Sequence, residues 1–311
     1  MSDLVVSLPA EEPLRDVLGE LPGVEFVDWD LDTPAPRPFF DIVVPPYWGG
    51  ARCLSALAGV EARLVQWQSI GYNGVAKHLP GGLPFANAAT VHEASTAELA
   101  LALTLAAQRG LPEFVRAGDE SRWELRSFPS LADRRVLLVG YGGVSQAVEA
   151  RLAGFEVQIE RLARSPREQR NLAGDAVEVR GFAELHERLA EAEIVILAVP
   201  LTDETRGLID AAALAAMPDG ALLVNVARGP VVETDALVAE LRSGRLRAAL
   251  DVTDPEPLPE GHPLWECPNT LITPHVGGDS SAMMPRMAAL LKRQIAHLRA
   301  GESPENLIDL G

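Results

Sequence analysis

Apolar residues in the second half of the chain follow two alternating patterns. Continuous apolar runs, typical of strands buried in a parallel sheet, are followed by segments whose apolar residues lie three or four positions apart, as in amphipathic helices. Strands are predicted at residues 136–139, 157–162, 177–179, 193–200, 221–227, 248–252 and 270–273, and helices at 144–152, 182–192 and 234–243. This alternation predicts a doubly wound parallel sheet with helices on both faces.

The first part of the chain repeats the alternation on a smaller scale. Strands are predicted at residues 4–8, 42–44 and 63–68, and helices at 12–18 and 53–57. These elements predict a small α/β domain of their own. A helix over 94–107, rich in Ala and Leu, is expected to cross between the two domains. A terminal helix is predicted over 283–298, and the residues from Asn306 are expected to return to the first domain.

The length and charge of the chain limit its possible partners. Its 311 residues are enough for two domains of ordinary size. The 44 Asp and Glu outnumber the 27 Lys and Arg, which gives a formal net charge of −17. An acidic surface repels nucleic acids and anionic membranes, so neither is an expected partner, and an anionic ligand needs local arginines or helix N-termini.

Cysteine usage and the N-terminus indicate the compartment. Cys53 and Cys267 lie far apart in the sequence and form no C-x-x-C pair. Neither a disulfide nor a metal site is therefore expected. No basic leader and no membrane-length apolar run is present, which predicts a cytoplasmic protein.

A glycine-rich turn follows the strand predicted at 136–139. Gly140 and Gly142 occupy the first two positions of a G-x-G-x-x-G pattern, and Ser145 stands where the third glycine is expected. In such turns the first glycine permits the tight turn. The second lets a pyrophosphate approach the backbone at the helix N-terminus, here Gly143 and Val144. The serine weakens the match, and a tight turn in some other parallel sheet is the alternative to a nucleotide site.

Four polar residues stand where later strands are predicted to end: Arg228, Asp251, Glu256 and His275. The carboxyl ends of parallel strands share one edge of a sheet, and the glycine turn lies on the same edge. Arginine can bind a substrate carboxylate through two parallel hydrogen bonds. Histidine exchanges protons near neutral pH, and a carboxylate partner favours its protonated form. Each residue alone has a structural explanation, but their shared location favours a catalytic site beside a dinucleotide.

Longer segments of the chain resemble the D-isomer-specific 2-hydroxyacid dehydrogenases. The similar segments are 66–71, 87–98, 200–208, 225–233, 249–258, 262–265 and 273–278, so the resemblance covers nearly the whole chain. It implies two Rossmann-like doubly wound parallel-sheet domains with the active site in the cleft between them. The dinucleotide-binding domain would span 99–280, and the catalytic domain would be discontinuous, with residues 1–98 plus 281–311. The resemblance also implies a homodimer.

The same resemblance implies roles for individual residues. Arg228 would bind the substrate carboxylate, His275 would be the general acid that protonates the carbonyl, and Glu256 would orient His275 and sustain its charge. Backbone amides of Ile70 and Gly71 would help to bind the substrate. The residues implied in cofactor binding are Gly140, Gly142, Gly143, Val144, Arg164, Ser165, Pro200, Thr205, Ala227, Asp251 and Gly278. Among these, Asp251 would contact the nicotinamide. No metal is implied.

The end of the strand predicted at 157–162 distinguishes NAD from NADP. Family members that prefer NAD usually carry an acidic residue there, which accepts hydrogen bonds from the ribose 2′-hydroxyl. Here the position is near Ala163 and is followed by Arg164 and Ser165, which suit a 2′-phosphate. NADP is therefore favoured over NAD. Glu160 is the competing candidate, because a strand that ended at Glu160 would favour NAD.

The sequence therefore predicts an oxidoreductase that transfers a hydride between NAD(P)H and a small 2-keto acid of the glyoxylate, hydroxypyruvate or pyruvate type. The alternative is a non-catalytic nucleotide-sensing protein on the same fold. A methyltransferase is disfavoured because it needs no set such as Arg228, Glu256 and His275. Formate is disfavoured as a substrate because, in the family that the chain resembles, that activity goes with Gln at position 256. Trp48 and Trp265 are candidates for a small substrate pocket, with surface or packing roles as the alternative.

Overall fold

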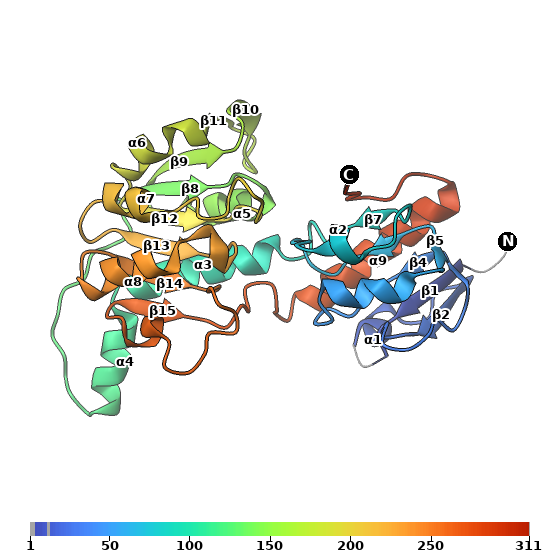
Figure 1. Ribbon diagram of the computed structural model, residues 1–311. Coiled ribbons are helices and arrows are strands. Elements are labelled where there is room, and N and C mark those ends of the chain that lie inside the picture. Colours follow the sequence, from blue (N-terminus) through green and yellow to red (C-terminus); the bar gives the residue numbers. More distant parts are fainter. Residues whose placement is uncertain (1–3, 11–12, 311) are drawn as a thin grey trace. The chain divides into compact units, whose positions relative to one another are not determined.

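The computed structural model describes residues 4–10 and 13–310 (Figure 1). The chain divides into two compact units. Unit 1 consists of residues 1–92 and 278–311, and unit 2 of residues 93–277. The sequence suggests borders at 98/99 and 280/281 instead. The first border lies earlier because the whole of helix α3 (Glu93–Gln108) is counted with unit 2, where it packs against helix α5 (Gly143–Leu152) and the sheet.

Unit 1 contains a five-stranded parallel sheet with the order β2-β1-β4-β6-β7. Its strands are β1 (Leu4–Leu8), β2 (Val24–Asp28), β4 (Ile42–Val43), β6 (Val65–Gln66) and β7 (Phe85–Ala86). A separate parallel pair is formed by β3 (Phe39–Phe40) and β5 (Glu61–Ala62). The predicted α/β domain is confirmed. The edge strand β2 was not predicted, because two acidic residues interrupt its apolar run.

Side chains that alternate along these strands enter two apolar layers. Ile42 packs in one layer with α1 (Leu14–Leu18) and α9 (Met283–Ala300). Its neighbour Val43 packs in the other with the 3₁₀ helix η1 (Ala51–Leu57). This opposite orientation follows from the two-residue period of a strand. Both faces of the sheet in unit 1 are therefore covered.

The C-terminal segment returns to unit 1, as the sequence predicts. The Asn87 amide donates a hydrogen bond to the Asn306 carbonyl at 3.2 Å, and the Ile308 amide donates to the Phe85 carbonyl at 2.9 Å. These bonds add the segment antiparallel to β7. At the other end of the chain, Glu12, the predicted start of the first helix, lies outside the described residues.

Unit 2 contains an eight-stranded sheet with the order β10-β11-β9-β8-β12-β13-β14-β15. Its strands are β8 (Arg135–Val139), β9 (Gln158–Ala163), β10 (Arg167–Arg170), β11 (Ala176–Gly181), β12 (Ile194–Leu197), β13 (Leu222–Asn225), β14 (Arg247–Leu250) and β15 (Thr270–Ile272). All neighbours are parallel except β10 and β11. The chain order reverses at β8, which lies between β9 and β12, and ligands bind such sheets beside the strand ends at this point. The predicted doubly wound sheet is confirmed.

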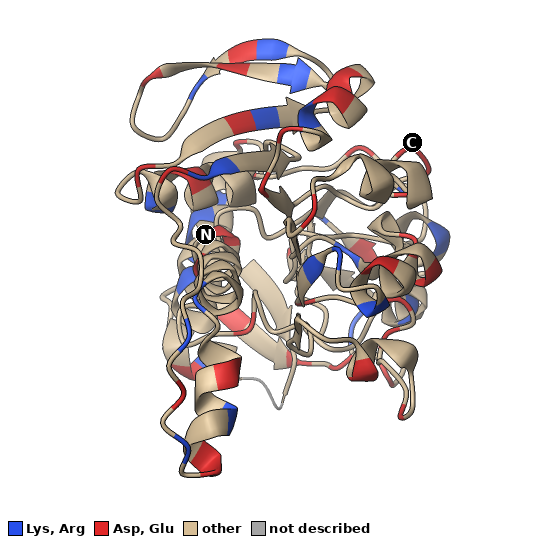
Figure 2. Cartoon of the chain, turned by 90° about the vertical axis from the view of Figure 1, so that its left-hand side faces the viewer, with Lys and Arg blue, Asp and Glu red and all other residues tan. Residues whose placement is uncertain are grey.

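The edge of this sheet is an antiparallel hairpin, where the sequence predicts only one strand at 177–179. The additional strand, β10, has the sequence Arg-Glu-Gln-Arg and offers no apolar residue that would indicate a strand. Acidic and basic residues are interspersed on the hairpin (Figure 2). Such a charged edge resists pairing with strands of other molecules.

Helices cover both faces of the sheet in unit 2. On one face α3 and α5 (Gly143–Leu152) share an apolar layer with the strands. On the other face lie α6 (Leu185–Leu189), α7 (Ala211–Ala216) and α8 (Thr234–Arg242). In the described part of the chain, no helix is both long and apolar enough to cross a membrane.

Helix α4 (Leu111–Asp119) and the extended residues 120–130 stand away from the sheet of unit 2 (Figure 1). We call residues 111–130 the arm. Its Trp123 side chain is 94% exposed and its Leu125 side chain 92%, and Val115 is also exposed. Large apolar side chains that are exposed together on one segment are typical of interfaces.

Candidate active site

The glycine turn between β8 and α5 has the geometry that its sequence predicts. Gly140 adopts a φ of +88°, and a β-carbon there would lie 2.7 Å from the Ala198 carbonyl oxygen, so both features require glycine. Gly142 caps α5, and a β-carbon on it would meet nothing within 4 Å. The N-terminus of α5, with the amides of Gly142, Gly143 and Val144, therefore leaves the room that a pyrophosphate needs. The turn fits a dinucleotide.

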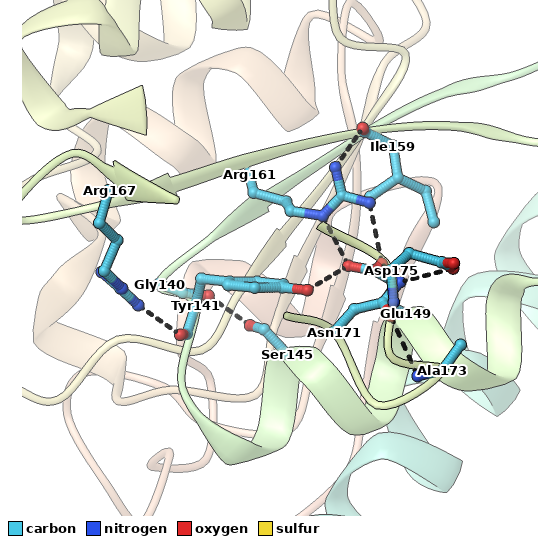
Figure 3. A network of polar contacts seen from close by, with 10 residues as sticks. All are labelled: Gly140, Tyr141, Ser145, Glu149, Ile159, Arg161, Arg167, Asn171, Ala173 and Asp175. Atoms are coloured by element: carbon cyan, nitrogen blue, oxygen red, sulfur yellow. Dashed lines mark hydrogen bonds and ion pairs between the residues drawn. The ribbon is translucent and has the colours of Figure 1, made fainter. Parts of the chain in front are cut away.

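Ser145, in the third glycine position, is buried, and its hydroxyl donates a hydrogen bond to the Gly140 carbonyl (Figure 3). The residue that weakens the sequence match thus adds a contact within the turn. Gly143 tolerates no larger residue without a shift, since a β-carbon there would lie 2.8 Å from Cγ of Glu93.

Strand β9 continues past Glu160 and ends at Ala163. Glu160 pairs in register with Leu137 in the middle of the sheet, and its carboxylate lies 3.5 Å from Nη1 of Arg188. It is therefore not the residue at the strand end. The exposed residues Arg164 and Ser165 follow the strand directly, and Arg164 forms only a 3.8 Å ion pair with Glu204.

The loop after β12 is closed by the buried Thr205. Its hydroxyl donates to the Pro200 carbonyl at 2.6 Å and accepts from the Thr202 amide at 2.8 Å. This loop follows the strand next to β8, so Pro200 lies at the carboxyl edge, where ligands of such sheets bind.

Arg228 lies in a loop that Asn225 holds at the end of β13. The buried Asn225 side chain donates to the Arg228 carbonyl at 3.1 Å and accepts from the Ala227 amide at 3.0 Å. The next residue, Gly229, lies so close to the chain at Thr253 that a β-carbon would be 1.9 Å from its carbonyl oxygen. Only glycine permits this approach, which brings the loop after β13 against the loop after β14.

Asp251, at the end of β14, organises the loop that contains His275. Its carboxylate accepts hydrogen bonds from the Thr273 hydroxyl at 2.6 Å, the Val276 amide at 3.0 Å and the Gly277 amide at 2.9 Å. Asp251 is 3% exposed. Its carboxylate therefore fixes the His275 loop, whatever contact it makes with a cofactor.

His275 is held in an uncommon backbone conformation. Its φ is +56°, and its amide donates to the carbonyls of Asp251 at 2.8 Å and Thr273 at 3.0 Å. A non-glycine residue in this region is strained by about 1–3 kcal/mol, and such strain is frequent at functional sites. The imidazole Nδ1 lies 2.5 Å from Oε1 of Glu256. The structure thus brings together the two side chains that the sequence separates by nineteen positions.

The charges around Glu256 favour its ionised form. Burial raises the pKa of this carboxyl, but the hydrogen bond with His275 and the nearby charges of His275 and Arg228 outweigh burial, so the pKa lies below its usual value. The side chains remain partly accessible, 41% for Glu256 and 36% for His275. The His275–Glu256 pair is therefore open to solvent rather than enclosed.

In unit 1, hydrogen bonds from two side chains hold the loop after β6, which contains Ile70 and Gly71. The Ile70 carbonyl accepts from the Asn87 side chain at 2.9 Å, and the Gly71 carbonyl accepts from the Trp67 indole at 3.0 Å. The Ile70 carbonyl shares a peptide plane with the Gly71 N–H, so the hydrogen bond from Asn87 also fixes the direction of that N–H. Gly278 also lies in unit 1, where its carbonyl is 3.1 Å from Nδ1 of His92.

The aromatic candidates differ in their contacts. Trp48 is 70% exposed and makes an edge contact with Tyr47, which in turn stacks on the ring of His92. Trp265 lies in the 3₁₀ helix η4 (Pro263–Glu266), and its indole donates to the Pro259 carbonyl. That bond ties Trp265 to its own loop.

Several residues that support the site were not singled out from the sequence. Asn225 and Thr273 hold the loops that contain Arg228 and His275, and a polar group centred on the buried Glu149 of α5 lies beside the glycine turn (Figure 3). That group consists of Tyr141, Glu149, Arg161 and Asn171. A glutamate on the buried face of an amphipathic helix was the available signal, because a buried carboxylate needs partners.

Comparison with known proteins shows which family the chain is similar to. Residues 101–277 match the family model described as D-isomer specific 2-hydroxyacid dehydrogenase, NAD binding domain. The chain is 33% identical over 263 residues to a glyoxylate reductase from Pyrococcus horikoshii, which covers 80% of this chain and 77% of the relative.

Two solved structures are similar over the full chain. The D-isomer specific 2-hydroxyacid dehydrogenase from Xanthobacter autotrophicus Py2, in complex with NADPH and MES, is 30% identical with a TM-score of 0.80, and 100% of this chain and 99% of that chain are covered. An NADPH-dependent glyoxylate/hydroxypyruvate reductase from Sinorhizobium meliloti, in complex with NADP and sulfate, is 25% identical with a TM-score of 0.82 and the same coverage.

Proposed function

The chain belongs to the D-isomer-specific 2-hydroxyacid dehydrogenases, and from that premise we propose that it reduces glyoxylate or hydroxypyruvate with NADPH. It is an oxidoreductase that transfers a hydride between a nicotinamide dinucleotide and a small 2-keto acid. The proposal rests on the His275–Glu256 pair, which follows strands of a sheet whose glycine turn fits a dinucleotide. The glyoxylate and hydroxypyruvate reductases among its relatives support the substrate class.

In this proposal His275 protonates the carbonyl oxygen of the keto acid. Its Nδ1 faces the Glu256 carboxylate, so we assign Nδ1–H to that hydrogen bond and the exchangeable proton to Nε2. Glu256 stays ionised at neutral pH because its pKa is lowered, and it holds the ring in one orientation. When bound, the dinucleotide supplies the hydride that reaches C2 of the substrate.

The substrate carboxylate is assigned to Arg228, whose planar guanidinium matches a carboxylate with two hydrogen bonds. The positive charge of Arg228 also contributes to the lowered pKa of Glu256. The amides of Ile70 and Gly71 are assigned to the same carboxylate.

The dinucleotide is assigned to the glycine turn and to loops that follow the neighbouring strands. The pyrophosphate would bind the α5 N-terminus. The residues assigned to the whole cofactor are Gly140, Gly142, Gly143, Val144, Arg164, Ser165, Pro200, Thr205, Ala227, Asp251 and Gly278. Among them, Asp251 already has three donors from its own loop, so we assign it mainly to holding that loop.

We further propose that NADP is preferred over NAD. Because β9 ends at Ala163, Glu160 lies too far back in the strand to receive the ribose 2′-hydroxyl. Arg164, with a 75% exposed side chain, is the cation nearest in sequence to the strand end. The NADPH and NADP complexes of the two similar structures support this choice.

We also propose that the protein is a cytoplasmic homodimer in which a second copy covers the arm. The exposed Trp123 and Leu125 would be shielded by that partner. Trp123→Glu should convert a dimer to a monomer in size-exclusion chromatography with light scattering. As a control, Trp48→Glu, also on an exposed tryptophan, should leave the dimer intact. A wild-type monomer, or a dimer that survives Trp123→Glu, would contradict the proposed interface.

The function itself is tested by assaying reduction of glyoxylate, hydroxypyruvate and pyruvate with NADH and with NADPH, and oxidation of formate with NAD+ and with NADP+. The expected result is reduction of glyoxylate or hydroxypyruvate, with the higher kcat/KM for NADPH. Turnover of none of them, with dinucleotide binding retained, would support a nucleotide-sensing protein instead. A higher kcat/KM with NADH would overturn the choice of cofactor alone.

A further inference from the structure

Arg167 and Arg164 stand three residues apart after β9, yet their surroundings differ. The Arg164 side chain extends into solvent, with a loose 3.8 Å ion pair to Glu204. Arg167 uses its guanidinium for three hydrogen bonds: to the Tyr141 carbonyl at 2.9 Å, the Ser165 carbonyl at 3.3 Å and the Gln169 side chain at 2.7 Å. The second arginine is therefore bound to the glycine turn itself (Figure 3).

We infer that Arg167 is a positioning residue of the glycine turn, which serves NADH and NADPH alike, whereas Arg164 alone recognises the 2′-phosphate. The inference rests on the proposed dinucleotide function. It separates two arginines that a sequence motif would assign to the same phosphate.

The geometry of the peptide plane explains how Arg167 acts. In a planar trans peptide the carbonyl and the following N–H point in opposite directions. Arg167 fixes the Tyr141 carbonyl, so it fixes the direction of the Gly142 N–H. In the same way, the hydroxyl of Ser145 fixes the Gly140 carbonyl and with it the Tyr141 N–H. These two peptide planes belong to the turn that would bind the pyrophosphate.

A buried carboxylate connects the turn to the hairpin that contains Arg167. Glu149, on α5, accepts hydrogen bonds from the Tyr141 hydroxyl at 2.6 Å, from Nε and Nη2 of Arg161 at 2.7 and 2.8 Å, and from Asn171 at 2.9 Å. We call Tyr141, Glu149, Arg161 and Asn171 the Glu149 cluster. Two donors reach each oxygen of Glu149, so the carboxylate is saturated. The cluster thus joins the glycine turn, α5, β9 and the hairpin.

The hairpin is oriented so that Arg167 can reach the turn. Asn171, at the far end of β10, presents its amide NH₂ to Glu149 because its oxygen accepts from the amides of Ala173 and Asp175. Arg167 and Asn171 are four positions apart, so they lie on the same side of an extended strand. Arg170 is on the alternate side and donates to the Gly174 carbonyl within the hairpin. Arg170 is therefore a matched control.

The test compares Arg164→Gln, Arg167→Gln, Arg167→Lys and Arg170→Gln by fluorescence titration with NADH and with NADPH. Arg167→Gln should raise both Kd values by the same factor, about tenfold, because a charge-assisted hydrogen bond to the turn is lost. Arg167→Lys should recover part of this loss, since lysine donates one hydrogen bond. Arg164→Gln should raise the Kd of NADPH only. Arg170→Gln should leave the Kd values of both NADH and NADPH unchanged.

Thermal unfolding of each variant identifies general loss of structure. A Tm of Arg167→Gln within about 2 °C of wild type, with both Kd values raised, supports a positioning role. A Kd raised for NADPH alone in Arg167→Gln would overturn it and make Arg167 a phosphate ligand. Failure of the wild type to bind either dinucleotide would contradict the proposed function. An equal effect of Arg164→Gln on both dinucleotides would contradict only the assignment of Arg164.

Discussion

Two carboxylates of unit 2 each form a hydrogen bond with a basic side chain, and for both of them burial raises the pKa but hydrogen bonds lower it further. Glu256 faces His275 with 41% and 36% of the two side chains exposed. Glu149 faces Arg161 with 7% and 16% exposed. Histidine can release its proton near neutral pH, whereas arginine cannot. The accessible pair, with an imidazole as partner, suits proton transfer, and the buried pair, with a permanently charged guanidinium, suits a rigid support.

The number of hydrogen-bond donors also distinguishes Glu149 from Glu256. Glu149 receives four hydrogen bonds from three side chains, which leaves no acceptor position for a ligand. Burial and the hydrogen bond to Glu149 raise the pKa of Tyr141 to about 12, so its hydroxyl stays a donor. Glu256 instead has the imidazole as its main partner and the charge of Arg228 nearby. A lowered carboxyl pKa therefore identifies a catalytic group only when its partner can exchange a proton and a substrate can reach it.

The largest expected effect is on catalysis, and it should arise from the His275–Glu256 pair but not from the Glu149–Arg161 pair. His275→Gln should lower kcat for keto-acid reduction by about 10³-fold, or roughly 4 kcal/mol, because the proton donor is lost. Its unfolding free energy should stay near that of wild type, since the side chain is partly exposed. Steady-state kinetics with His186→Gln, an exposed histidine on α6, is the control. Turnover close to wild type in His275→Gln would remove it from the mechanism.

The next effect concerns stability rather than chemistry. Glu149→Gln should lower the free energy of unfolding by about 3 kcal/mol, because the charge of Arg161 is left buried without its partner. Urea unfolding measures this loss. Glu168→Gln, on the exposed part of β10, should change stability by less than about 0.5 kcal/mol. Equal stability of the two variants would contradict the structural role of the Glu149 cluster.

Glu256→Gln should have an intermediate effect on catalysis and little on stability. An amide can still accept the Nδ1–H hydrogen bond but carries no charge to stabilise the protonated imidazole. We expect kcat to fall by about 30-fold, or roughly 2 kcal/mol. If urea unfolding showed a loss as large as that of Glu149→Gln, the contrast between the two carboxylates would disappear.

The smallest expected effect is a pH dependence of the stability that the Glu149–Arg161 pair contributes. The pKa of Glu149 in the folded protein lies below its ordinary value of 4.5, despite burial, because Arg161, Tyr141 and Asn171 donate to it. The pair therefore stabilises the fold fully above about pH 4.5 and less as pH falls through the lowered pKa. The Tm difference between wild type and Glu149→Gln should shrink between pH 6 and pH 3, as measured by scanning calorimetry. A constant difference would mean that the charge of Glu149 contributes nothing.

Predictions from the sequence were best where a local pattern is sufficient. The strands predicted at 136–139 and 221–227 contain continuous apolar runs, over 136–139 and 221–224, and both are present as β8 and β13. Strand β10 and the edge strand β2 lack such patterns, because partners elsewhere in the chain determine them. Ser145 shows the same limit: it weakens the motif in sequence, but its hydroxyl bonds to the turn in the structure.

By itself the sequence determined the parallel sheets, the glycine turn and the family, and the roles of Arg228, Glu256 and His275 are predictions from it. Apolar periodicity and turn chemistry act over a few residues, so they can be recognised in the sequence alone. Only the tertiary structure decided that β9 passes Glu160 and ends at Ala163, that Asp251 holds the His275 loop, and that Arg167 binds the turn. These features depend on strand register and on hydrogen bonds between distant segments, and no local pattern specifies either.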